Sequence, residues 1–197
     1  MAEQIMNFQY KGSRDYIHGT DIFNETLAWL SGRKGEVRDI DFTFHRVAAK
    51  QLKLVPGPLP EGVEPVAACA FKSAEGREKA YLVETEQAVA GRYPYDEDEI
   101  VGAMAFDLDG RKATLRAQTG YSDIEVWVAM TKALHYKVFP QLEGKWLFVR
   151  GRFPAYERHT AAQERVLAIA ASFNDKLTRS EAWQDGVKVG EIFFSIV

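Results

Sequence analysis

Apolar residues recur along the chain with two different periods, which together predict helices and strands. Residues 20–32 carry Phe23, Leu27 and Leu30 at spacings that place all three on one face of a helix. Thr20 is a residue type that caps helix N-termini, and the glycine that ends this range is typical of a helix stop. The pattern predicts an amphipathic helix that packs one face against a core.

A second helical pattern covers residues 122–134. Ser122 is the expected N-cap residue, and Pro140 prevents the helix from continuing far beyond this range. The expected buried stripe consists of Ile124, Trp127, Val128, Thr131 and Leu134. This stripe again predicts a helix with one face in a core.

Most of the remaining chain alternates apolar and polar residues or carries β-branched and aromatic runs, which is typical of strands. The expected strands cover residues 5–10, 39–54, 65–72, 77–86, 99–106, 112–118, 145–156, 164–173, 177–183 and 187–196. Turn-forming residues begin short connections at Asp109, Asn174 and Asp185. These signals predict antiparallel hairpins between consecutive strands.

The two helices stand in similar surroundings, which indicates a tandem repeat. Thr20 and Ser122 are each followed by an Asp-Ile pair, and each is preceded by a tyrosine in a short loop and by a strand. A strand rich in Phe and Arg follows each helix. The order of elements predicts two units, residues 1–108 and residues 109–197.

Composition excludes several classes of protein. The 197 residues are 46% hydrophobic and 27% charged, which is typical of globular proteins. A net charge of -3 and a pI near 5.9 argue against binding to nucleic acid. The longest apolar stretch, residues 166–173, is far shorter than the roughly 20 residues of a membrane helix, and the polar start predicts a cytoplasmic protein. Cys69 is the single cysteine, and the histidines lack metal-site spacing, so we expect neither metal nor cofactor.

One amphipathic helix with an antiparallel sheet in each half resembles the hot-dog fold, and two such halves resemble the double hot-dog arrangement. The resemblance implies an α+β fold in which each antiparallel sheet wraps around one long helix. Hot-dog proteins mostly act on acyl thioesters of coenzyme A or acyl carrier protein, as thioesterases or as hydroxyacyl dehydratases and hydratases. The resemblance therefore implies a partner that is an acyl thioester. The charge and the short apolar stretches predict no nucleic-acid or membrane partner, and a homo-oligomer stays an open alternative.

In the dehydratase branch of the family, a histidine precedes one helix and an acid comes from the helix of the other unit. His18 lies just before the first helix, and the segment from Ile124 to Met130 is similar to the family's Ile-Glu-Ala-Met helix start. The resemblance implies that His18 is the base and Glu125 the acid in dehydration of 3-hydroxyacyl thioesters or hydration of enoyl thioesters. The His-Phe-Pro and Pro-Gly of the family's dehydratase loop are absent here.

Other residues are candidates for binding the substrate. Backbone N–H groups at the helix starts, near Gly19 and Tyr121, are suitable donors to a thioester carbonyl. Asn24 follows the first helix start and could line a pocket. Strand alternation places Arg150 and Arg152 on one face, where their guanidinium groups could hold the phosphates of a pantetheine carrier.

Two alternatives to the dehydratase stay open. In an acyl thioesterase, a carboxylate or amide near a helix start positions water or attacks directly, and the candidates are Asp21, Asn24, Glu25 and Asp123. In a non-catalytic acyl-binding hot-dog protein, these acids would be helix caps or solvated first-turn residues. On that reading His18 would be a loop residue bonded to neighbouring backbone.

Overall fold

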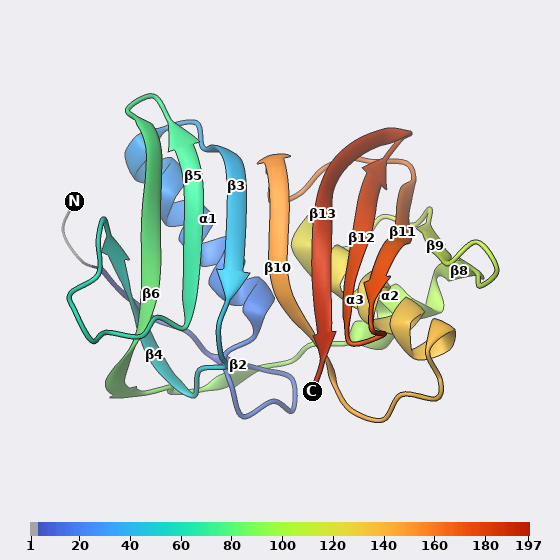
Figure 1. Ribbon diagram of the computed structural model, residues 1–197, viewed down its shortest axis with the longest axis horizontal. Helices are drawn as coiled ribbons and strands as arrows, with labels where there is room; N and C mark the ends of the chain where they lie inside the picture. The colour runs from blue at the N-terminus through green and yellow to red at the C-terminus, as the bar shows by residue number, and fades with distance from the viewer. Residues whose placement is uncertain (1–3) are drawn as a thin grey trace. The chain divides into compact units, whose positions relative to one another are not determined.

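The computed structural model describes residues 4–197 and divides the chain into two compact units, Met1–Tyr95 and Asp96–Val197 (Figure 1). Each unit contains an antiparallel sheet and one long helix against a face of that sheet. Within residues 4–197, none of the helices has both the length and the apolar character that a membrane crossing requires. The α+β class predicted from the sequence is confirmed.

The sheet of the first unit has the strand order β1-β4-β6-β5-β3, with every pair antiparallel. The elements are β1 (Gln4–Met6), β2 (Tyr10–Lys11), α1 (Gly19–Lys34), β3 (Arg38–Phe44), β4 (Lys50–Pro56), β5 (Ala67–Ser73), β6 (Gly76–Ala88) and β7 (Arg92–Tyr93). The short strands β2 and β7 form a separate parallel pair. That pair brings the segment before α1 next to the segment that ends the unit.

Helix α1 buries the predicted stripe but starts and ends elsewhere than predicted. Phe23, Leu27 and Leu30 are at most 5% exposed, and the Phe23 ring lies 5.2 Å from that of Phe42 on β3. The N-cap residue is His18, not Thr20, because the hydroxyl of Thr20 is buried inside the first turn as a hydrogen-bond partner. The helix passes through the expected glycine stop and ends before Gly35, whose φ of 71° favours glycine.

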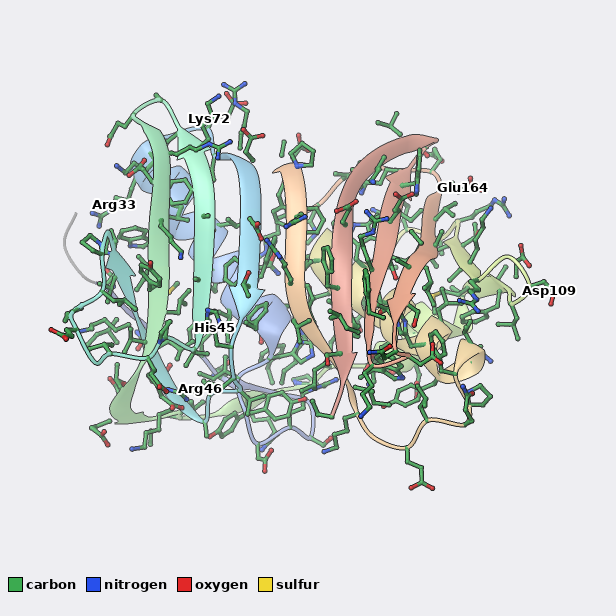
Figure 2. The ribbon with its side chains drawn as sticks, in the orientation of Figure 1. Arg33, His45, Arg46, Lys72, Asp109 and Glu164 are labelled. Atoms are coloured by element: carbon green, nitrogen blue, oxygen red, sulfur yellow. The ribbon has the colours of Figure 1, made fainter. Side chains whose placement is uncertain are left out.

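The predicted strand 39–54 is two strands, β3 and β4, separated by a turn. The Glu84 carboxylate on β6 holds this turn by accepting from the backbone N–H groups of Ala49 and Lys50 and from the guanidinium of Arg46. His45 and Arg46 therefore lie where β3 ends, in a turn rather than inside a strand (Figure 2).

The sheet of the second unit has the strand order β10-β13-β12-β11-β9-β8, again antiparallel throughout. The elements are α2 (Glu97–Gly102), β8 (Met104–Asp107), β9 (Lys112–Leu115), α3 (Asp123–Val138), β10 (Trp146–Ala155), β11 (Arg165–Phe173), β12 (Leu177–Gln184) and β13 (Val187–Ile196). Asn174, Asp175 and Asp185 have φ near +50°, as expected of the predicted tight hairpin turns on both sides of β12.

The boundary between the units lies after Tyr95, earlier than the expected boundary after residue 108. The segment expected to form a strand over 99–106 instead divides into α2 and β8, which both belong to the second unit. β8 pairs with β9 across the hairpin tip at Asp109 (Figure 2), and α2 packs against α3. Lys132 of α3 pairs with Glu97 of α2 at 2.9 Å, which fixes this contact.

Helix α3 begins after Ser122, as predicted, and the predicted stripe is buried. Near its end, His135 is also fully buried beside Trp146, whose ring lies 4.5 Å away. Its Nδ1 lies 2.6 Å from the carbonyl of Thr131, and its Nε2 lies 2.5 Å from the hydroxyl of Thr178. Since a carbonyl only accepts, the neutral ring donates through Nδ1 and accepts through Nε2.

We expect stability to fall in acid because of His135. Burial lowers the pKa of this imidazole from 6.5 to about 4, so the folded protein binds the proton less well than the unfolded chain. Stability is unaffected by this group above pH 6.5 and falls as the pH decreases from 6.5 to 4. At pH 4 the loss in the free energy of unfolding is about 3 kcal/mol. Urea unfolding at pH 7 and pH 4 measures it. His135→Gln should lose this dependence, whereas His45→Gln, at an exposed position, should retain it.

Candidate active site

Asp123, the first residue of α3, presents a buried carboxylate to the loop before β11 and to the end of β12. Its side chain is 4% exposed. Oδ1 pairs with the Arg165 guanidinium at 3.0 Å. Oδ2 accepts from the Thr160 hydroxyl at 2.6 Å and from the Gln184 side-chain amide at 2.7 Å. One carboxylate therefore binds a cation through one oxygen and two neutral donors through the other.

The three polar side chains close a triangle of hydrogen bonds. Gln184 Nε2 also donates to Thr160 Oγ1 at 2.8 Å, while that hydroxyl donates its own proton to Asp123. The hydroxyl oxygen thus lies between an amide donor and a carboxylate acceptor. Such an arrangement polarises the O–H bond and fixes its direction.

Local structure holds each member of this triangle in place. The Glu125 carboxylate accepts from the N–H and the hydroxyl of Ser122, which fixes the first turn of α3. Arg165 begins β11 and also donates to the Thr160 carbonyl at 3.0 Å. Gln184 ends β12, directly before the turn residue Asp185. The Asp185 carboxylate accepts from the backbone N–H groups of Gln163 and Glu164, in the loop before β11.

A pocket of about 210 Å³ opens at the triangle. The residues that line it are Asp123, Trp127, Phe153, Ala155, Tyr156, Glu157, Thr160, Gln184 and Val189. Its polar lining includes all three members of the triangle, and its apolar lining is dominated by aromatic rings. This combination of a few placed polar groups and apolar walls is typical of small-molecule sites.

Tyr156 adds a neutral hydroxyl to the pocket lining. Its oxygen accepts from the backbone N–H of Ile124, in the first turn of α3, at 3.3 Å. Burial raises the pKa of Tyr156 well above its ordinary value, so the phenol keeps its proton over the physiological range. A phenol that accepts from a helix N-terminus is a suitable hydrogen-bond donor to a carbonyl oxygen.

The start of α1 carries a second polar cluster, which includes His18. Lys11 is fully buried and binds the hydroxyl of Thr20 and the carboxylate of Asp21, each at 3.1 Å. Tyr93 donates to the other oxygen of that carboxylate at 2.7 Å. His18 Nδ1 lies 2.7 Å from the Thr20 hydroxyl. The structure thus brings His18 and Asp21 into one network around the Thr20 hydroxyl and the Lys11 ammonium.

Glu125 and Tyr121 make contacts that stabilise the fold. Glu125 caps α3 through Ser122, as described above. The Tyr121 hydroxyl shares its one proton between the Asp96 carbonyl at 3.0 Å and the Glu99 carboxylate at 3.1 Å. The pKa of Tyr121 is raised, mainly by burial and to a smaller extent by the neighbouring Glu99 carboxylate. Catalytic and substrate-binding roles for these two residues stay predictions.

The other predicted substrate-binding residues lie on two elements, α1 and β10. Gly19 is the first residue of α1, and Asn24 on the same helix is 4% exposed. Arg150 and Arg152 both lie over the Phe193 ring, at 5.7 and 5.5 Å, so the predicted shared face is confirmed. Within residues 4–197, no three His, Cys, Asp or Glu side chains are grouped to hold a metal ion.

Sequence reasoning identified Asp123 but missed its partners. Thr160 and Gln184 are 37 and 61 positions away, and neither lies in a motif or in a helix start. Arg165 is the second residue of the predicted strand 164–173, where an exposed cation would be ordinary. No local pattern distinguishes these three residues from surface positions.

The fold resembles that of several known protein structures, although the sequence does not match any known family. No family model and no curated protein sequence matches the chain. The structure of the tesB protein MAP1729c from Mycobacterium avium subspecies paratuberculosis matches with a TM-score of 0.55 at 10% identity, covering 99% of this chain and 93% of that chain. The dehydratase domain of PpsC from Mycobacterium tuberculosis, in complex with C12:1-CoA, matches with a TM-score of 0.53 at 12% identity, covering 99% and 92%. The chain has the double hot-dog fold.

The proteins that share this double hot-dog fold are named for different activities. Beside the tesB protein and the dehydratase domain, a structure described as an oleoyl thioesterase of Lactobacillus plantarum matches with a TM-score of 0.50 at 10% identity, covering 99% of this chain and 96% of that chain. At these identities the likeness concerns the fold alone. The activity of this double hot-dog protein must therefore be argued from its own side chains.

Proposed function

We propose that the protein is an acyl-thioester hydrolase whose catalytic group is Asp123 with Thr160 and Gln184. The observation that carries this proposal is the bonding of Asp123 Oδ2, which accepts from both partners at the lining of the pocket. A buried carboxylate in contact with a hydroxyl and an amide is equipped to bind a water molecule and accept its proton.

The reaction needs only water besides the thioester. A water molecule that donates a hydrogen bond to the Thr160 hydroxyl oxygen attacks the thioester carbonyl carbon. Its proton passes to that oxygen while the hydroxyl proton moves to the Asp123 carboxylate. The tetrahedral intermediate then collapses, the C–S bond breaks, and the proton passes from Asp123 to the leaving thiolate. The products are a carboxylic acid and a free thiol.

Two further groups support this chemistry. Arg165 compensates the charge of the buried carboxylate through Oδ1 and leaves Oδ2 facing the two neutral donors. Tyr156, bound to an N–H of the first turn of α3, would donate to the carbonyl oxygen as it gains negative charge in the transition state. Every group that the mechanism uses lies in the second unit.

The thioester carrier is proposed to be coenzyme A or acyl carrier protein. Both carry a phosphopantetheine arm. Arg150 and Arg152 lie on the face of β10 opposite Phe153 and the pocket, so phosphate binding by these two residues stays a prediction separate from this site. The structurally similar PpsC dehydratase domain has bound C12:1-CoA, which supports this class of partner.

A second candidate function is dehydration or hydration of 3-hydroxyacyl and enoyl thioesters with His18 as base and Glu125 as acid. One observation favours it: the Thr20 hydroxyl, which also contacts the buried Lys11 ammonium, orients the His18 ring through Nδ1. Glu125 is less suited to act as an acid, because its carboxylate accepts two hydrogen bonds from Ser122. Hydrolysis is therefore the preferred proposal.

We expect Thr160→Val to lower kcat for acyl-coenzyme A hydrolysis roughly 10²-fold, because it removes the hydroxyl that positions the water. KM should change little, since the substituted side chain keeps its shape. Thiol release followed with a colorimetric reagent measures both constants. Thr160→Ser should retain most of the activity, and Thr114→Val, on β9, serves as a matched control. Equal rates for the Val variant and the wild type would contradict the role of Thr160.

A further inference from the structure

Phe153 forms part of the pocket wall and rests on two glycines of the sheet. It lies on β10 and is 3% exposed. A Cβ atom on Gly190 would lie 2.7 Å from Phe153 Cε1 and 2.7 Å from the Arg152 carbonyl oxygen. A Cβ atom on Gly151 would lie 2.8 Å from Phe153 Cε2. The ring therefore occupies the space that side chains at these positions would need.

The pairing of the strands explains this arrangement. β10 and β13 run side by side, with Arg152 opposite Glu191 (Figure 1). Continuing that register by one residue brings Phe153 opposite Gly190, on the pocket face of the sheet. An aromatic ring that covers a glycine on the neighbouring strand is held in one position by close packing. The position of this part of the wall thus depends on the absence of a side chain at residue 190.

The size and charge of the pocket restrict the acyl group. A volume of about 210 Å³ lies below the roughly 300–1,000 Å³ of pockets that enclose drug-sized ligands. Trp127, Phe153 and Val189 supply apolar surface. The charged lining residues are two acids. Arg165 compensates the charge of Asp123, and the carboxylate of Glu157 disfavours an acyl group that carries its own carboxylate.

We propose that the pocket binds the acyl group of short-chain, uncharged acyl thioesters and that Phe153, positioned by Gly190, limits the chain length. This inference rests on the proposed hydrolase function, because it places the acyl carbonyl at the Asp123 triangle. A smaller side chain at 153 then deepens the pocket, and a side chain at 190 pushes the ring into it. The two substitutions act on chain length in opposite directions.

The test uses the full chain and two readouts. The first is kcat/KM for acetyl-, butanoyl-, hexanoyl-, octanoyl- and succinyl-coenzyme A. The second is the dissociation constant, from calorimetry, of the corresponding non-hydrolysable thioether analogues. The variants are Phe153→Leu, Gly190→Ala and the double variant. Gly32→Ala is the matched control, because a Cβ at that helical position meets nothing within 4 Å.

We expect the wild type to prefer acetyl and butanoyl groups and to discriminate against succinyl. Phe153→Leu should improve binding and turnover of the octanoyl compounds at least 10-fold, since each added methylene in an apolar pocket changes selectivity by roughly 10-fold or more. Gly190→Ala should weaken hexanoyl binding about 10-fold with little effect on acetyl, and the double variant should restore hexanoyl binding. If Gly190→Ala does not fold, the Phe153→Leu series alone decides the question.

The outcomes separate this inference from the proposed function. Analogue binding with the expected chain-length shifts but without thiol release would support the acyl pocket and contradict hydrolysis. Thiol release with one chain-length profile in all variants would support hydrolysis and overturn the role of Phe153. Absence of analogue binding, or tighter binding of succinyl than of butanoyl analogues, would overturn the inference.

Discussion

Asp123→Asn is expected to lower kcat/KM for acyl-thioester hydrolysis roughly 10³-fold. The amide cannot accept the proton of the attacking water, and it no longer provides a charged acceptor for the Thr160 hydroxyl. Most of the loss should be in kcat, because the shape of the pocket is unchanged. Steady-state kinetics with acetyl- and butanoyl-coenzyme A measure the effect.

The same substitution also removes the anion that faces Arg165, so activity and stability must be separated. A guanidinium that is buried without its partner is expected to destabilise the fold by about 3–5 kcal/mol. The double variant Asp123→Asn/Arg165→Gln carries no such charge and should regain part of this stability. Its activity should stay as low as that of the single variant. Recovery of activity together with stability would show that Asp123 is structural only.

The second large effect is expected at Lys11, in the first unit. Lys11→Met should lower the free energy of unfolding by about 3–5 kcal/mol, because Asp21 and the Thr20 hydroxyl lose a buried cation. The ammonium also lies 4.3 Å from the centre of the Tyr95 ring, a contact that methionine replaces only in part. Urea unfolding followed by circular dichroism measures the loss.

Two further variants serve as controls for the stability loss expected in Lys11→Met. Lys50→Met removes an exposed ion pair with Glu86 and should change stability little. Lys11→Met combined with Asp21→Asn leaves no uncompensated charge and should be more stable than Lys11→Met alone. Equal stabilities for Lys11→Met and Lys50→Met would mean that the buried pair contributes no more than a surface pair does.

Both units have an aspartate near the start of the long helix that pairs with a buried cation. Asp21 in the first turn of α1 pairs with buried Lys11, and Asp123 at the start of α3 pairs with buried Arg165. A carboxylate is favoured at this end of a helix, and a buried one needs a cation. The units differ in the second oxygen, which accepts from the phenol of Tyr93 in the first unit and from a hydroxyl and an amide in the second.

Local patterns predicted much of the fold because hydrophobic periodicity and turn chemistry act over short distances. The stripe of α3 and the turn at Asp185 were correct for that reason. The end of α1 was misplaced because Gly35, not Gly32, adopts the positive φ that ends the helix. Other failures have tertiary causes. Residues 97–102 form a helix that packs against α3. The turn after β3 depends on Glu84, which no local pattern connects to that segment.

The candidate site was predictable only in part. Asp123 stands at a visible helix start, so its position could be identified, although a capping role explained it equally well. Its function depends on Thr160 and Gln184, which the folded sheet brings together from distant positions. The similarity of the α3 start to a family motif pointed to Glu125 instead, and the structure shows that this carboxylate binds Ser122.

The most direct test of the central claim is product analysis in water enriched in oxygen-18, with butanoyl- and 3-hydroxybutanoyl-coenzyme A as substrates. The hydrolase account predicts free coenzyme A and an acid that carries the heavy oxygen in its carboxylate, with both products lost in Asp123→Asn and retained in His18→Ala. Mass spectrometry detects the label. Formation of the enoyl thioester without free thiol, abolished by His18→Ala, would contradict the account in favour of a dehydratase. Intact substrates in every sample would contradict catalysis at this site.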